Sequence, residues 1–286
     1  MLPGKAGHAW AGQSRPATAR HGQVRQSLAM PALTVMEKIM AKQKEEVGNL
    51  TIALSKASAY KRFAVWIVGD TPLITHAWSQ KAKLEMLGKQ VKAVKGGKAA
   101  RDPESDFVNS LYEMGDGTYG FPTMGVKNCI LSAAHKDRGI ARSAALGALW
   151  LDAQMVRTRP ALHSAICDMP LTRIYGGDPE QPDHPPLCRE DMVKIGAGLN
   201  KIANLAYRAQ FTVWAMHVTG RYNTSILSDE TLGFLIMESG MSSGLGEWRN
   251  ERRGMFGAFH LAEPEEAAEW DKFRAGKGAL PLPESY

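Results

Sequence analysis

The chain has 286 residues, of which 44% are hydrophobic, and a formal charge of +6 at pH 7. A chain of this length and composition can bury a substantial core in one large or two small domains, which excludes a wholly disordered protein. No apolar run approaches the ~18–20 residues that span a bilayer, and the first residues lack the apolar segment of a secretory signal. The cysteines Cys129, Cys167 and Cys188 are odd in number and form no CxxC pair, which indicates reduced thiols and a cytoplasmic protein.

The positive charge is concentrated at the beginning of the chain. Residues 1–62 hold ten Lys or Arg against three Glu, and residues 1–30 show no apolar period. We predict that residues 1–58 form a basic, largely disordered arm with a weak helix. The arm is either a solvated tail or a contact for nucleic acid, and residues 1–29 are either native or translated from upstream of a later start.

An α+β domain is predicted over residues 59–262. Its first strand, residues 63–68, reads FAVWIV and is apolar on both faces, so it belongs inside a sheet. Residues 71–78 form the exit loop, and residues 79–90 have the pattern of a helix.

A basic insertion is predicted over residues 79–104. From position 81 to position 101 there are seven Lys or Arg and one Glu, and Gly96 and Gly97 make this stretch flexible. Such a stretch neutralises phosphates through a salt-sensitive attraction that does not depend on base sequence. It is either a flap that closes over a nucleic-acid strand or a solvated loop that keeps the protein soluble.

A hairpin and a helix are predicted next. Residues 106–114 and 118–121 flank an Asp-Gly turn and are predicted to pair. In residues 123–135, apolar side chains recur at intervals of three and four residues, which predicts a helix. Lys127 lies in its first turn, where a cation opposes the helix dipole and so indicates an anionic partner.

The middle of the chain gives a weaker pattern. Residues 139–175 fit helix or strand over most of their length, and LTRIYG near their end predicts a strand. A Pro-rich insertion spans residues 176–190. In residues 205–219, successive side chains fall alternately on two faces, which predicts one long bent strand or a hairpin. His217 on this stretch is interpreted as a packed histidine and not as a catalyst.

A helix, a glycine-rich loop and a strand follow one another near the end of the domain. Ser228 is expected to cap a helix over residues 229–239. Gly244 and Gly246 let the following loop turn tightly or lie close to another chain. Residues 256–261 form an apolar strand. This order disfavours a dinucleotide-binding loop, in which the strand precedes the glycines.

The glycine-rich loop also carries Trp248, Arg249, Arg252 and Arg253. Arginine offers a planar fork of donors for phosphate, and an indole stacks on a base or on a guanidinium. The loop therefore either holds nucleic acid or is a surface loop whose arginines pair with Glu247 and Glu251. An acidic tail over residues 263–286 completes the chain.

The order of these elements predicts the fold. The strands at 63–68, 205–219 and 256–261 and the helices at 123–135 and 229–239 give β-α-β-β-α-β. This order is the α+β, ferredoxin-like (RRM-like) plan with large insertions.

With that order, the chain resembles the RAMP superfamily, the RNA-recognition-like folds that form the backbone subunits of CRISPR effector complexes. The likeness lies in TPLITH at 71–76, in GFPTMGVKNCILSAA at 120–134 and in GLGEWRNERRGMFGAF at 244–259, which covers most of the glycine-rich loop. The resemblance implies binding to a single strand or an RNA–DNA hybrid through its backbone, with copies stacked along it. The chain also looks like small proteins of phage and prophage genomes, which would place it in a bacterial host cytoplasm.

We therefore predict a non-catalytic, oligomerising protein that binds single-stranded DNA, RNA or a hybrid. One alternative is a phage structural or assembly subunit, and another is a metal-dependent nuclease that uses carboxylates such as Asp102 or Asp106. The predicted nucleic-acid-binding residues are Lys81, Lys83, Lys89, Lys92, Lys95, Lys98, Arg101, Lys127, Gly244, Gly246, Trp248, Arg249, Arg252 and Arg253.

Several enzyme classes lack their motifs in this sequence. There is no GxSxG, HExxH or GxxxxGK[ST], and His184 and Cys188 have no further ligands with zinc-site spacing. We predict no cofactor, no metal site and no catalytic residue, and the sequence leaves enzymatic activity open.

Overall fold

The computed structural model describes residues 60–78, 80–91, 102–158, 160, 162, 165–195 and 202–283. The chain divides into two units, residues 1–57 and 58–286, and all described residues belong to the second. The predicted arm and the middle of the predicted basic insertion, residues 92–101, lie outside the described residues.

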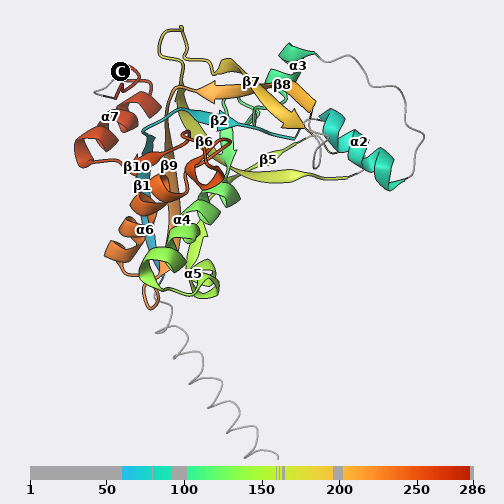
Figure 1. Ribbon diagram of the computed structural model, residues 1–286. Helices are drawn as coiled ribbons and strands as arrows, with labels where there is room; N and C mark the ends of the chain where they lie inside the picture. The colour runs from blue at the N-terminus through green and yellow to red at the C-terminus, as the bar shows by residue number, and fades with distance from the viewer. Residues whose placement is uncertain are drawn as a thin grey trace, which may run out of the picture. The chain divides into compact units, whose positions relative to one another are not determined.

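The main sheet has the ferredoxin-like order. Within the described residues it contains seven strands, five of which run in the order β10-β1-β9-β6-β3, and every pair is antiparallel (Figure 1). These five strands are β1 (Tyr60–Gly69), β3 (Gly120–Pro122), β6 (Asp168–Gly177), β9 (Val213–Asn223) and β10 (Phe259–Leu261). The short strands β4 (Leu149–Leu151) and β5 (Gln154–Arg157) pair with β9 and β6.

Two helices complete the β-α-β-β-α-β plan. The helix α4 (Thr123–Arg138) lies between β1 and β6 in the chain, and α6 (Asp229–Ser242) lies between β9 and β10. Counting only β1, β6, β9 and β10, the spatial order is fourth, first, third, second. The predicted α+β, ferredoxin-like fold is therefore confirmed.

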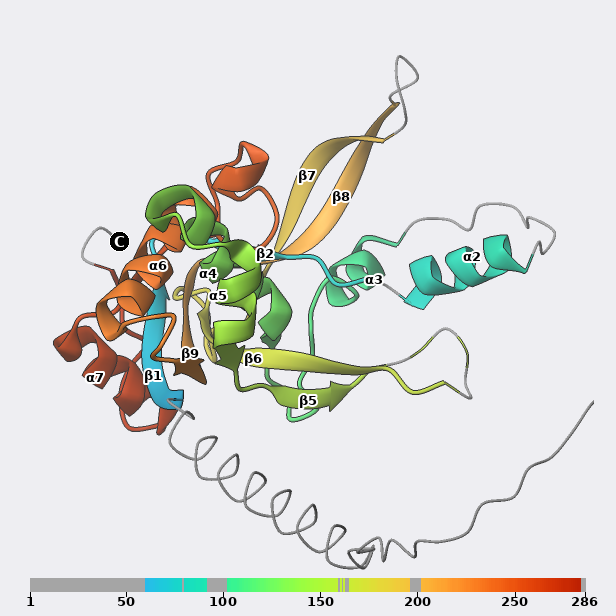
Figure 2. The same ribbon diagram turned by 90° about the horizontal axis from the view of Figure 1, so that it is seen from below.

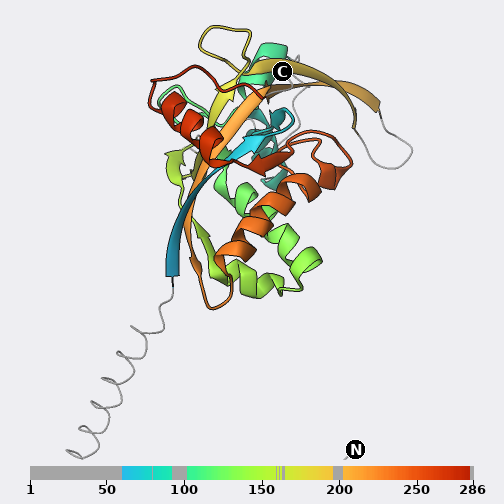
Figure 3. The same ribbon diagram turned by 90° about the vertical axis from the view of Figure 1, so that its left-hand side faces the viewer.

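Period-two alternation in β1 divides the core between the two faces of the main sheet. Ile67 is buried with α4 and α6, whereas Trp66 and Val68 are buried on the other face with Trp270. Trp270 belongs to α7 (Pro264–Arg274). Figure 3 shows α7 in red on one side of the sheet and α4 and α6 in green and orange on the other.

A second, three-stranded sheet is formed by β2 (Leu73–Thr75), β8 (Ile202–Phe211) and β7 (Leu187–Ile195). Figure 2 shows β7 and β8 extending from the main sheet as a hairpin. The chain bends at Thr212, so the predicted stretch 205–219 is divided between two sheets. The prediction that both middle strands of the core lie in this stretch is wrong. The strand β8 pairs with β2 and β7 in the second sheet, and β6 pairs with β9 in the main sheet instead.

Three local predictions also change. Residues 106–114 form no continuous strand, because α3 (Pro103–Val108) begins at a proline with acidic residues in its first turn. The predicted pairing holds only next to the Asp-Gly turn, where Glu113 pairs with Tyr119. The undecided stretch after α4 contains both α5 (Arg142–Ala148) and short strands. Of the predicted strand 256–261, only the last three residues pair with β1.

Other local signals were reliable. The predicted helix 79–90 is α2 (Gln80–Gln90). Ser228 caps α6, since its hydroxyl accepts a hydrogen bond from the Thr231 amide at 3.1 Å. The loop after α6 contains one 3-10 turn, η1 (Asn250–Arg252).

Candidate nucleic-acid interface

The glycine-rich loop, defined here as residues 243–258, faces α4 across a cleft of about 350 Å³, which we call the loop cleft. Segments that are far apart in the sequence meet there. The lining residues are His76, Tyr112, Phe121, Gly125, Asn128, Cys129, Ser132, Arg142, Ser243, Gly244, Leu245, Gly246, Glu247, Arg249 and Glu251. The structure thus brings together three of the predicted binding residues, Gly244, Gly246 and Arg249.

The glycines allow the loop backbone to lie directly on its neighbours. Gly246 has a φ of +77°, and a Cβ at this position would lie 2.4 Å from the Ile74 carbonyl oxygen. The amide of Glu247 donates to this same oxygen at 3.0 Å. Gly257, with a φ of +68°, accepts from the amide of Leu245 at 2.8 Å. The glycines therefore pack the loop against β2 and against the returning chain.

The arginines of the loop differ in whether they pair with an acidic side chain. Arg249 donates to the Glu251 carboxylate at 2.7 and 3.0 Å and to the Gly246 carbonyl at 2.9 Å, so it fixes the loop. Arg252 and Arg253 are exposed, and neither forms an ion pair in the part of the chain that the structure describes. The predicted pairing with acidic neighbours thus holds for Arg249 alone.

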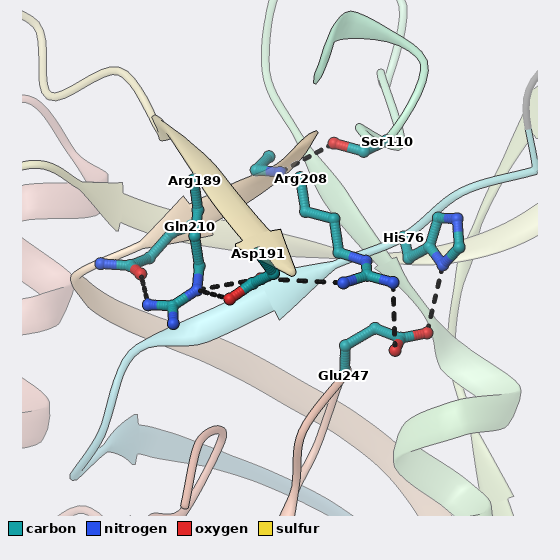
Figure 4. A network of polar contacts seen from close by, with 8 residues as sticks. His76, Ser110, Arg189, Asp191, Arg208, Gln210 and Glu247 are labelled. Carbon is teal, nitrogen blue, oxygen red and sulfur yellow. Dashed lines mark hydrogen bonds and ion pairs between the residues drawn. The ribbon is translucent and has the colours of Figure 1, made fainter. Parts of the chain in front are cut away.

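A polar network ties the glycine-rich loop to the β7–β8 hairpin (Figure 4). Glu247 lies 3.2 Å from His76 Nδ1 and 3.9 Å from Nη2 of Arg208. Arg208 also lies 3.7 Å from Asp191, to which Arg189 donates at 2.9 Å. Arg208 is only 8% exposed, and its Nε and Nη1 have no hydrogen-bond partner among the described residues. A buried guanidinium of this kind depends on its two carboxylate neighbours for stability.

The same arginines lie against aromatic rings of the loop. The guanidinium of Arg208 is 5.8 Å from the centre of the Trp248 ring, and that of Arg189 is 4.6 Å from the centre of the Phe256 ring. Trp248 has a φ of +55° and is 36% exposed. The hairpin therefore supports Trp248 from one side and leaves part of the indole in solvent.

Three ionisable groups that line the loop cleft have shifted pKa values, and one of them is Tyr112, whose pKa is raised by burial and by Glu247. The hydrogen bond from His76 lowers the pKa of Glu247 despite partial burial, and Arg208 and Arg249 add to this effect. Burial raises the pKa of Cys129 to about 11, so its thiol is protonated at neutral pH. The Cys129 thiol donates to the carbonyl oxygens of Ser239 and Gly244 at 3.4 and 3.3 Å.

The predicted lysines lie elsewhere. Lys127 is in the first turn of α4, but its ammonium lies 6.0 Å from the centre of the Trp150 ring, and partial burial lowers its pKa. Lys83 and Lys89 belong to α2, where Lys89 is exposed. Lys81 is in α2, but its side chain lies outside the described residues, as do Lys92, Lys95, Lys98 and Arg101.

Sequence reasoning missed several residues of this region. Arg142 opens α5 and lines the loop cleft, as do Asn128 and Ser132 on α4. Arg189 and Arg208 were missed as well, although a charged side chain within the apolar alternation of β8 was a usable signal.

The described residues contain no group of three or more His, Cys, Asp or Glu side chains that could hold a metal ion. Asp102 and Asp106, which a nuclease would use, lie at the cap and inside α3. None of the helices in the described ranges is long and apolar enough to cross a membrane.

Neither a protein-family model nor a curated protein matches this sequence. Among solved structures, the chain is similar to one in the "Cryo-EM structure of the Type III-B Cmr-beta bound to cognate target RNA". The TM-score is 0.37 at 12% identity, over 78% of this chain and 65% of that chain. This chain thus spans less than two thirds of the length of that neighbour, and a likeness of this strength assigns no function.

Proposed function

We propose that this protein is a non-catalytic, oligomerising nucleic-acid-binding protein. It holds single-stranded nucleic acid, or an RNA–DNA hybrid, by the sugar–phosphate backbone in the loop cleft. The observation that carries the proposal is the meeting of the glycine-rich loop and α4 across a cleft of about 350 Å³ whose wall contains Arg142. Its volume is near the lower end of the ~300–1,000 Å³ typical of ligand pockets, which suits a nucleotide-sized segment.

The charge balance of the loop cleft supports an anionic ligand. Glu251 is paired with Arg249, and Glu247 is paired with Arg208 and His76. Arg142 is exposed and forms no ion pair with any described residue, so its charge is the one left unbalanced. A guanidinium in a cleft that the side chains of Asn128 and Ser132 also line suits a phosphate group.

Two further features support binding of a strand. Trp248 exposes part of its indole, and the same loop carries the exposed Arg252 and Arg253, a combination that suits a stacked base and its phosphates. The predicted basic flap, with Lys92, Lys95, Lys98 and Arg101, would add the electrostatic attraction expected for a polyanion. The RAMP-like order of elements agrees with this function.

The proposal is tested by fluorescence anisotropy with labelled single-stranded RNA and DNA at about 50 mM and about 200 mM salt. We expect wild-type protein to bind, and to bind more weakly at the higher salt. Arg142→Glu should lower the affinity about three- to tenfold. It should also make the slope of log affinity against log salt concentration shallower, by about the contribution of one phosphate contact.

Lys277→Glu is the matched control, because it makes the same charge change at an exposed residue that follows α7, on the other face of the main sheet. It should change the affinity less than about twofold. Absence of binding at low salt, or equal losses in the two variants, would contradict the proposal. Assembly into oligomers without any nucleic-acid affinity would instead support the structural-subunit alternative.

A further inference from the structure

Three cavities share the short segment that follows β2, residues 76–78. His76 lines the loop cleft and also a cavity of about 500 Å³, which Ala77 and Trp78 line as well. Ala77 and Trp78 also line a groove of about 660 Å³, here called the Trp78 groove, and Tyr112 lines both this groove and the loop cleft. The shared walls make the loop cleft and the Trp78 groove neighbours.

The shared segment is held in place by hydrogen bonds to Ser110 and Tyr112. The Ala77 amide donates to the Ser110 carbonyl at 2.9 Å, and the Tyr112 hydroxyl donates to the His76 carbonyl at 3.2 Å. Ser110 is itself fixed on β8, because its hydroxyl accepts from the Ala209 amide at 2.8 Å. The backbone that carries Trp78 is therefore set by hydrogen bonds before any ligand arrives.

The Trp78 side chain is 62% exposed, although it follows a buried strand closely. The walls of its groove include the apolar side chains of Val108, Met169 and Leu171. Lys83, Glu113 and Arg157 also line it, and Arg157 is paired with Asp168 at 3.0 Å. An exposed indole in a groove with apolar walls has the chemistry that takes an unstacked base.

We propose that the strand bound in the loop cleft continues past His76 and stacks one of its bases on Trp78. The occupant is the same strand, because Tyr112 is a wall of both sites and a strand that leaves the loop cleft there enters the Trp78 groove. This inference rests on the proposed function and adds to it a second, base-contacting site that is reached only by a strand long enough to leave the loop cleft.

The test measures the affinity of the full-length chain for labelled homopolymers of about 4 to about 16 nucleotides, the usual range of single-strand site sizes. The polymer is RNA or DNA, whichever the wild type binds more tightly. Trp78→Ala should weaken binding of the longest strands about 5- to 150-fold, which corresponds to the loss of one stacked base at ~1–3 kcal/mol, and leave binding of the shortest strands unchanged. Arg142→Glu should weaken binding at every length.

Two controls identify the contact. Trp150→Ala removes another exposed tryptophan, one that lines none of the three cavities, and should have no length-dependent effect. A strand of the same length that lacks bases should bind wild type and Trp78→Ala equally. Thermal melting of each variant reports whether it is folded.

The outcomes separate the two proposals. If wild-type protein binds no strand, the proposed function fails, and this inference fails with it. If wild-type protein binds and Arg142→Glu weakens binding, but Trp78→Ala matches wild type at every length, only the inference is overturned. A Trp78→Ala loss that is the same for short, long and base-free strands would also overturn it.

Discussion

The glycine-rich loop and α7 lie on opposite faces of the main sheet and are held there by different forces. The loop is fixed by backbone hydrogen bonds, such as Leu245 to Gly257 at 2.8 Å, and by ion pairs. By contrast, α7 is fixed by Trp270, which is almost completely buried and stacks on Trp66 with ring centres 6.0 Å apart.

This difference indicates that α7 stabilises the fold, whereas the glycine-rich loop can contact a ligand. A segment held by apolar burial contributes to the free energy of folding and offers few polar groups to a ligand. A loop held by close backbone contacts and charges keeps polar groups at the surface, but its geometry allows little change. Substitutions in α7 should therefore change stability, whereas substitutions in the loop should change both stability and binding.

The largest expected effect is at Trp270. Trp270→Ala should lower the free energy of unfolding by ~3–5 kcal/mol, because it empties the space of a large buried ring. Trp270→Phe should cost much less, since it keeps an aromatic ring and removes an indole N–H that has no hydrogen-bond partner among the described residues. Urea denaturation measures both values. A phenylalanine variant as unstable as the alanine variant would show that α7 is not held by aromatic packing.

The next effect is at Gly257. Gly257→Ala should cost ~2–4 kcal/mol, because its φ of +68° disfavours a side chain and the new Cβ would lie 1.8 Å from the Leu245 carbonyl oxygen. Gly276, after α7, has a nearly equal φ of +66° and nothing within 4 Å of such a Cβ. Gly276→Ala should therefore cost only ~1–2 kcal/mol.

The same pair of variants separates binding from stability. In the anisotropy assay under conditions where both variants are folded, Gly257→Ala should weaken nucleic-acid binding and Gly276→Ala should not. Equal affinities would show that the shape of the glycine-rich loop is not needed for recognition.

The smallest effect is at His260, which joins the two regions. His260 lies 2.6 Å from Asp70, whose amide donates to Ala258 of the loop, and 2.9 Å from Glu266 on α7. Burial lowers the pKa of His260, but the hydrogen bonds to Glu266 and Asp70 outweigh burial and raise the pKa above its ordinary value. The folded state therefore binds the proton more tightly than the unfolded state.

The sign of the pH effect follows from this raised pKa. The stabilisation is complete below the unfolded pKa of about 6.5 and is lost as pH rises through the higher folded pKa. Melting of wild type and of His260→Gln between pH 6 and about 9 should show a difference that shrinks as pH rises. His217, whose pKa is lowered by burial and by Arg274, is present in both proteins and cancels in this difference. A difference that does not change with pH would contradict the raised pKa.

Local signals in the sequence predicted much of the fold. The apolar run at 63–68, the helical period at 123–135 and the cap at Ser228 each depend on residues that are neighbours in the chain, and each element formed where expected. The wrong assignments concern pairing. The sequence showed that residues 205–219 are extended, but which strand lies beside β9 depends on the bend at Thr212.

The candidate site divides in the same way. Trp248 and the loop glycines are visible as a cluster in the sequence. Arg142, Arg208 and Trp78 carry no local signal of a shared role, since the folded chain brings them to the cavities around β2 from separate elements.

The sequence by itself determined several elements of this protein, among them β1, α4 and α6, and the chemistry of its loop, because caps, periods and turn residues act between near neighbours. Only the tertiary structure decided which charges are already neutralised. Pairing of Arg249 with Glu251 and of Glu247 with Arg208 leaves Arg142 available to an anion. A charge is available to a ligand only when no partner lies within a few ångströms, and that distance is set by the fold.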